Sequence, residues 1–198
     1  MLSRERDYDP NRYELHTIDR LLRVVSEWEC NSLIWFGDRK ELLKMLAFDV
    51  IVGNCDRHQG NWGFIRSRVA PDMHYRLAPM YDPASCLGAE LHDKDRHLRV
   101  GEKEFEIRVR KYVRSATSGF GDGTKTLSLS EVAKDLFRID GWRRTLEESV
   151  TILRSNMDSV HTALESVPEY WYPAPRRRLA LAILVARMAL VEEFLHDH

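Results

Sequence analysis

The sequence predicts a mainly α-helical domain of the α+β class, in which one short β-hairpin interrupts the helices. Apolar residues recur at steps of three and four along much of the chain, which is the period of an amphipathic helix. Two short runs, residues 61–65 and 75–80, have strand character and are separated by the turn sequence Ala70-Pro71-Asp72. The composition, with 43% hydrophobic and 31% charged residues, is typical of a chain that folds around a core.

The chain of 198 residues suits a single domain, which we expect to extend over residues 1–198. A formal net charge of -1 gives no overall attraction to nucleic acid or to an anionic membrane, so we expect neither as a direct partner. The 3 cysteines include no C-x-x-C pair, which favours a reducing compartment. The charged beginning resembles no signal peptide, and the longest apolar stretch is shorter than the roughly 20 residues of a membrane span. We therefore expect a cytoplasmic protein.

The first half of the chain is expected to form two helices and then the hairpin. After Asp9-Pro10, apolar residues at helical spacing predict a helix from about Asn11 to Trp28. Asp38 and Glu41 form a capping-box pattern, so a second helix is expected to begin there and to end at Gly53. The hairpin follows at about residues 62–80.

The second half begins with a charged segment, residues 83–126, that we expect to be irregular. The string SGFGDGTK, residues 118–125, matches no phosphate-binding motif and is interpreted as a mobile loop. A capping-box pattern at Ser128 and Glu131 begins a helical tail over residues 128–198, with helices expected at about 129–138, 141–164 and 175–196. The aromatic turn at residues 168–173 is open to two interpretations: packing against the core, which we favour, or a docking patch.

A polar cluster interrupts the apolar run FDVIVGNCDRHQGNWGFI, residues 48–65. Asp56 and Asn61 are five residues apart, and Asp82 follows the second strand in the sequence Met-Tyr-Asp. Phosphoryl transfer needs such a set. One carboxylate must orient the attacking hydroxyl and accept its proton, while an amide oxygen and a second carboxylate hold magnesium ions on the nucleotide phosphates. Protein kinases place the first two side chains as Asp-x-x-x-x-Asn, so the spacing indicates a kinase-type catalytic core at residues 48–82.

The strings IVGNCDRHQGNW and LAPMYD together resemble the catalytic core of the HipA-like kinases, which are the toxins of bacterial toxin-antitoxin pairs. The catalytic loop also resembles that of the phosphoinositide 3- and 4-kinases. The resemblance implies a protein-kinase-like large helical lobe whose β-hairpin carries the metal site. It implies Asp56 as the catalytic base, Asn61 and Asp82 as Mg²⁺ ligands, and His58 and Tyr81 as neighbours of the nucleotide, with ATP and Mg²⁺ as cofactors. For His58, a bond to backbone carbonyls of the loop is an equally good interpretation.

The same resemblance implies an activity and partners. The activity is phosphorylation of serine or threonine in a protein substrate, which the resemblance places in the translation machinery. A DNA-binding antitoxin is the implied partner. A second Asp-Arg-His triplet at residues 95–97 has Val100 where the amide is needed, so the triplet alone predicts nothing.

The sequence differs from the family in one respect. HipA-like kinases have a small N-terminal lobe that covers the phosphates with a loop and a lysine, and nothing before Asp56 resembles it. We therefore expect the small lobe to be absent from this chain and to come from a separate partner. Two hypotheses remain: a catalytic lobe that needs this partner, and an inactive lobe that serves as a binding module in a toxin-antitoxin system.

Overall fold

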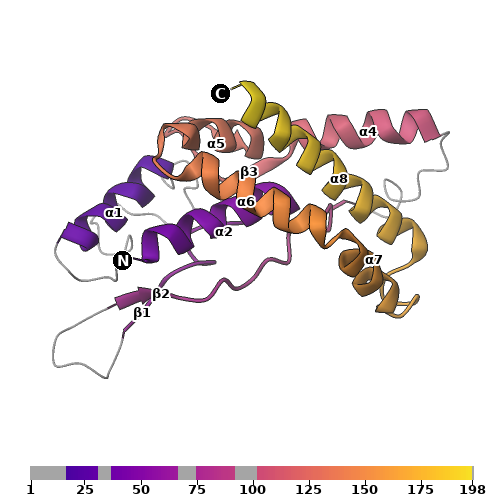
Figure 1. Cartoon of the computed structure of the whole chain (residues 1–198), viewed down its shortest axis with the longest axis horizontal. Coiled ribbons are helices and arrows are strands. Elements are labelled where there is room, and N and C mark those ends of the chain that lie inside the picture. The colour runs from indigo at the N-terminus through magenta and orange to yellow at the C-terminus, as the bar shows by residue number, and fades with distance from the viewer. Residues whose placement is uncertain (1–16, 31–36, 67–74, 92–101, 198) are drawn as a thin grey trace.

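The computed structural model describes residues 17–30, 37–66, 75–91 and 102–197. This part of the chain is mainly helical and contains two separate antiparallel strand pairs (Figure 1). The helices are α1 (Ile18–Cys30), α2 (Asp38–Val52), α4 (Glu102–Ser115), α5 (Leu129–Asp135), α6 (Trp142–Ser155), α7 (Met157–Ser166) and α8 (Ala174–Asp197), with a 3-10 turn η3 (Leu136–Arg138). The strands are β1 (Phe64–Arg66), β2 (Tyr75–Leu77), β3 (Thr117–Gly121) and β4 (Thr126–Ser128). The predicted mainly helical fold is confirmed.

Helix α2 forms the centre of the core because apolar residues occur on nearly all of its sides. Leu42, Leu46 and Ala47 are each exposed by 1% or less. The helix packs against α5, α6 and α8, and α8 also packs against α4. Each fully buried leucine contributes about 1.5–3 kcal/mol to stability. The core therefore holds α2 in place, and the predicted catalytic loop begins at the end of this helix.

The predicted hairpin is formed by β1 and β2, with Ile65 opposite Arg76. It lies at one side of the molecule, next to α2 (Figure 1). The Leu77 N–H donates a 3.0 Å hydrogen bond to the carboxylate of Asp38, which attaches β2 to the first turn of α2. The predicted capping role of Asp38 is wrong: Gly37 is the N-cap, and the buried Asp38 carboxylate binds the hairpin instead. The predicted turn at residues 70–72 lies outside the described residues, as do residues 11–16 of the first predicted helix.

The prediction of an irregular segment at residues 83–126 is wrong over its second part. Helix α4 forms there because Phe105, Val109 and Val113 recur every four residues and are buried, while the charged residues between them face solvent. The string SGFGDGTK is also not a mobile loop. Its first half forms β3, which pairs with β4, and all but one of the residues of β3 are buried.

The helical tail agrees with the prediction except at one point. The capping box at Ser128 is confirmed, since its hydroxyl accepts from the Glu131 N–H at 3.1 Å and its own N–H donates to the Glu131 carboxylate at 2.7 Å. The helix predicted at residues 141–164 is divided at Asn156, whose side-chain amide donates to the Ile152 carbonyl. No helix of the described residues is long and apolar enough to cross a bilayer.

The aromatic turn between α7 and α8 does not pack against the core as we had favoured. Tyr170 is 77% exposed and Trp171 is 67% exposed, and their rings contact each other edge to face. The turn is instead attached through the buried Arg177, which donates to the Val167 carbonyl and pairs with Glu165 and Glu169.

Candidate functional site

The predicted catalytic loop, which carries Asp56 and Asn61, begins where α2 ends. Gly53 has φ 72, in the left-handed region that favours glycine, and its N–H closes the helix on the Asp49 carbonyl. A Cβ at this position would lie 2.8 Å from Nε of Arg187 on α8. The predicted end of the helix at Gly53 is therefore confirmed, and the chain changes direction there.

The loop is anchored by Arg57, whose side chain is fully buried. Its Nε and Nη2 donate to the two carboxylate oxygens of Asp49 on α2, at 2.8 and 2.9 Å. Its Nη1 donates to the carbonyl of Asn61 and, at 2.9 Å, to the carbonyl of Tyr81. One guanidinium thus joins α2, the residue predicted to bind Mg²⁺ in the loop, and the residue that precedes Asp82.

The Asp49 carboxylate that receives Arg57 is buried as well. Burial raises the pKa of Asp49, while the hydrogen bonds and charge of Arg57 and the Asn54 amide, at 2.7 Å, act in the opposite direction. Asn54 in turn accepts from the Asp56 N–H at 3.3 Å. The ion pair is therefore the inner end of a hydrogen-bond chain that reaches the predicted catalytic base.

Asn61 is oriented by the loop backbone. Its Nδ2 donates to the backbone carbonyl of Asp56 at 2.7 Å, and its N–H donates to the carbonyl of His58 at 3.0 Å. Because the nitrogen end of the amide is bound to Asp56, the amide presents Oδ1 as its acceptor end. A carbonyl-type oxygen fixed in this way is a suitable ligand for Mg²⁺.

The carboxylate of Asp56 is half-exposed, with 48% of the side chain accessible, as a base that meets a substrate hydroxyl must be. His58 Nε2 lies 3.7 Å from the Asp56 Oδ1. Nδ1 of His58 accepts from the Gly60 N–H at 2.9 Å, which places the proton of a neutral imidazole on Nε2. The histidine thus bonds the loop backbone, but through the N–H of Gly60 and not through a carbonyl as the alternative interpretation expected, and it faces the predicted base.

Asp82 is exposed and has φ 50, a left-handed conformation that is uncommon outside glycine. The segment after it is bound to the catalytic loop, because the Cys55 N–H donates to the Ser85 carbonyl and the Leu87 N–H donates to the Val52 carbonyl, both at 2.9 Å. The Tyr81 hydroxyl donates to the Gly60 carbonyl at 3.1 Å. Asp56, Asn61 and Asp82 therefore come from two segments that are hydrogen-bonded to each other.

Strand β3 packs directly against the backbone of the catalytic loop. A Cβ on Gly119 would lie 2.5 to 2.8 Å from the backbone C, O and N of Arg57, closer than real Cβ contacts. Only glycine allows the strand to approach the loop this closely. Neither the close approach at Gly119 nor the burial of Arg57 is predicted by the sequence. The available signal was the position of Arg57. It directly follows the predicted base and comes eight residues after Asp49, an aspartate inside an apolar run.

The predicted Mg²⁺ ligands fit the ion chemically, although the described residues contain no group of three or more His, Cys, Asp or Glu that could hold a metal. Mg²⁺ keeps several waters and is usually bound by one or two carboxylates together with substrate phosphates. One amide oxygen and one exposed carboxylate, on adjoining segments, match that requirement. Whether Asn61 and Asp82 bind the ion stays a prediction.

The chain is similar in sequence and in fold to a known kinase. The chain is 28% identical, over 105 residues, to a serine/threonine-protein kinase, CtkA, of Helicobacter pylori; the matched region covers 44% of this chain and 32% of the relative. The crystal structure of the proinflammatory kinase CtkA of H. pylori has the same fold, with a TM-score of 0.61 at 22% identity, over 79% of this chain and 54% of that one. The chain thus spans about a third to a half of the length of these kinases.

The family model of the HipA-like C-terminal domain matches residues 2–139. This range includes α2, the Arg57 loop, both hairpins and α5, and it is wider than the core of residues 48–82 on which the sequence resemblance rested. The chain belongs to the family of HipA-like C-terminal domains.

Proposed function

We propose that the chain is the catalytic lobe of a serine/threonine protein kinase, which transfers the γ-phosphate of ATP to a hydroxyl of a protein substrate. The observation that supports this most strongly is the Arg57 anchor, which binds the carbonyls of Asn61 and Tyr81 at once. It keeps the loop amide and the Asp82 segment together, and phosphoryl transfer depends mainly on such positioning.

Each residue of the site has a role that its surroundings support. In the reaction, the bond between the γ-phosphorus and its bridging oxygen breaks, a bond to the substrate oxygen forms, and ADP leaves. The exposed Asp56 carboxylate orients the substrate hydroxyl and takes its proton. The Asn61 Oδ1 and the Asp82 carboxylate would hold Mg²⁺, which when bound neutralises charge on the phosphate oxygens. Tyr81 and His58 bind the backbone of residue 60 and keep the loop in shape.

We propose further that the lobe is weak or inactive alone and needs a second segment that covers the phosphates. Asp56, Tyr81 and Asp82 are partly or fully open to solvent in this chain. Charge stabilisation is worth much less in water than in a closed cleft of low dielectric constant. A DNA-binding antitoxin as partner and substrates in the translation machinery are proposals that rest on the family resemblance alone.

Reconstitution tests this proposal. The chain is mixed with a small-lobe partner, either the product of a neighbouring gene or the matching segment of a longer chain, and phosphate incorporation into an acceptor protein is followed by mass spectrometry. We expect incorporation only in the mixture, and its loss in Asp56→Ala with an unchanged unfolding curve. Robust transfer by the chain alone would contradict the need for a partner, and an active Asp56→Ala mixture would contradict the role of the base.

A further inference from the structure

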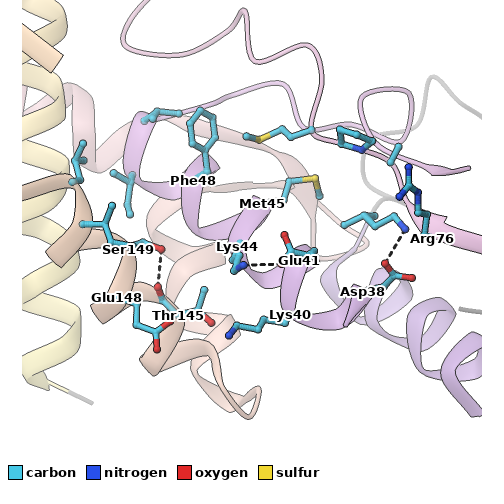
Figure 2. A pocket seen from close by; sticks show the side chains of 18 of the residues that line it. Asp38, Lys40, Glu41, Lys44, Met45, Phe48, Arg76, Thr145, Glu148 and Ser149 are labelled. Carbon is cyan, nitrogen blue, oxygen red and sulfur yellow. Dashed lines mark hydrogen bonds and ion pairs between the residues drawn. The ribbon is translucent and has the colours of Figure 1, made fainter. Parts of the chain in front are cut away.

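A cavity lies beside strand β2. It has a volume of about 810 Å³ and is bounded by α2, by residues 76–80 and by α6 (Figure 2). Ligand sites typically measure about 300–1,000 Å³. None of Asp56, Asn61 and Asp82 lines it, although Met80 is only two residues before Asp82.

The cavity is an elongated trough. Its lining follows α2 from Asp38 to Val52, and at 1.5 Å per residue this corresponds to roughly 20 Å. Figure 2 shows Arg76 beside Asp38 at one end and Phe48 toward the other. An extended molecule fits this shape better than a compact one.

The lining is mostly apolar, and nearly all of its polar groups are engaged. Met45, Phe48, Ile51, Leu77, Met80 and Ile152 supply much of the apolar surface. The Thr145 hydroxyl donates to the Gly141 carbonyl at 2.8 Å, and the Ser149 hydroxyl donates to the Thr145 carbonyl at 2.7 Å. Lys44 pairs with Glu41 at 2.7 Å, and Glu148 accepts from Arg144 at 2.9 Å. A ligand therefore finds few hydrogen-bonding groups that are not already satisfied.

Two cations differ from the rest of the lining. Lys40, in the first turn of α2, and Arg76, on the exposed face of β2, have neither an ion pair nor a side-chain hydrogen bond within the described chain. Both belong to the end of the trough near Asp38, whose own carboxylate is buried and bound to the Leu77 N–H. This end can accept an anionic group, whereas the opposite end, near Phe48 and Ile152, is mostly apolar.

We propose that the trough binds an amphipathic anion with one acidic head group and an extended apolar chain, of the fatty-acid type. Burial of the chain against α2 and α6 supplies the affinity, at about 25 cal/mol per Å² of apolar area, and Arg76 and Lys40 select the charged head. An extended peptide suits the trough less well, because its backbone N–H and C=O groups need partners that the engaged lining does not offer. The proposal does not depend on the kinase activity.

Calorimetric titration of the chain with sodium decanoate, below its micelle concentration, tests the proposal. We expect saturable binding at one site. The neutral analogue decanol should bind at least tenfold more weakly, and butanoate should not bind measurably. The double variant Lys40→Ala/Arg76→Ala should lose at least tenfold in affinity for decanoate, whereas Lys103→Ala, which removes an exposed charge from α4, should bind like the unmodified chain.

A second pair of variants tests the apolar end. Ile152 lines the trough and is 65% exposed, and Ile107 on α4 is 58% exposed and lies outside it, so both tolerate a charge without loss of the fold. Ile152→Glu should abolish decanoate binding, and Ile107→Glu should leave it unchanged. Equal binding of decanoate and decanol, equal effects of the two glutamate variants, or preference for an acidic peptide over decanoate would each overturn the proposal.

Discussion

At the scale of single residues, the structure contains two fully buried arginines with opposite surroundings. Arg57 is 1% exposed and donates short hydrogen bonds to Asp49, Asn61 and Tyr81. Arg187 is equally buried, but its Nη1 reaches only the Val50 carbonyl at 3.5 Å, and its Nε and Nη2 have no hydrogen-bond partner among the described residues. Burial accordingly lowers the pKa of Arg187.

The two arginines should therefore respond differently to the same substitution. Arg57→Met leaves the buried Asp49 carboxylate without its partner, and we expect a loss of about 3–5 kcal/mol in the free energy of unfolding. Arg187→Met removes a buried charge that is poorly paired, and we expect a change of about 1 kcal/mol or less, in either direction. Urea unfolding of both variants measures these differences. Equal losses would show that the hydrogen bonds of Arg57 are not what holds the loop.

At the scale of elements, β3 fixes the position of the catalytic loop through one glycine. Gly119→Ala places a methyl group against the backbone of Arg57, so either the strand or the loop must move. We expect it to weaken Mg²⁺-dependent ATP binding at least threefold and to lower stability by about 1–3 kcal/mol, the usual cost of overpacking. Gly37→Ala is the matched control, since it meets nothing within 4 Å and has φ -82. If both variants behaved like the unmodified chain, the close approach would have no consequence for the site.

The capping box of α5 gives a prediction about pH. Lys125, together with the backbone N–H and the hydroxyl of Ser128, lowers the pKa of Glu131 from 4.5 to about 2. Folding favours the ionised form of Glu131. Its contribution to the stability of the fold is therefore present above pH 4.5 and is lost as the pH falls toward 2. Because the Glu131 side chain is exposed, we expect this contribution to the free energy of unfolding to be about 0.2–1 kcal/mol. Thermal unfolding of Glu131→Gln should show this deficit at pH 7 and none near pH 2; a deficit that does not depend on pH would contradict the charge-based explanation.

Local sequence signals identified some elements and not others, for physical reasons. The helix that ends at Gly53, the hairpin and the Ser128 cap follow from local periodicity and capping, and the sequence suffices for them. Helix α4 was missed because its three buried side chains are separated by many charges. Strand β3 was missed because glycine is unfavourable inside a strand. The glycine at position 119 is explained only by its contact with Arg57, which is distant in the sequence. Likewise, Asp38 binds the hairpin 39 residues away, which no local capping pattern indicates.

At the scale of the whole molecule, the fold is that of a HipA-like C-terminal domain built around α2, which leads into the predicted site at its C-terminal end and lines the trough along its length. The spacing of Asp56 and Asn61 indicates a kinase-type core, and the strings IVGNCDRHQGNW and LAPMYD carry the resemblance to the family. The burial of Arg57 and the shape of the trough depend on contacts between distant segments, so they required the structure.

The measurement that tests the central claim most directly is ATP binding by the purified chain, followed by NMR titration with and without Mg²⁺. We expect weak binding, with a Kd of about 1 mM, equivalent to about 4 kcal/mol, that requires Mg²⁺. Asp82→Asn should weaken the Mg²⁺-dependent binding at least tenfold, while Asp158→Asn, on the exposed face of α7, should have no effect. Binding that is independent of Mg²⁺, or equally sensitive to both substitutions, would contradict the account of the site as a phosphotransfer centre.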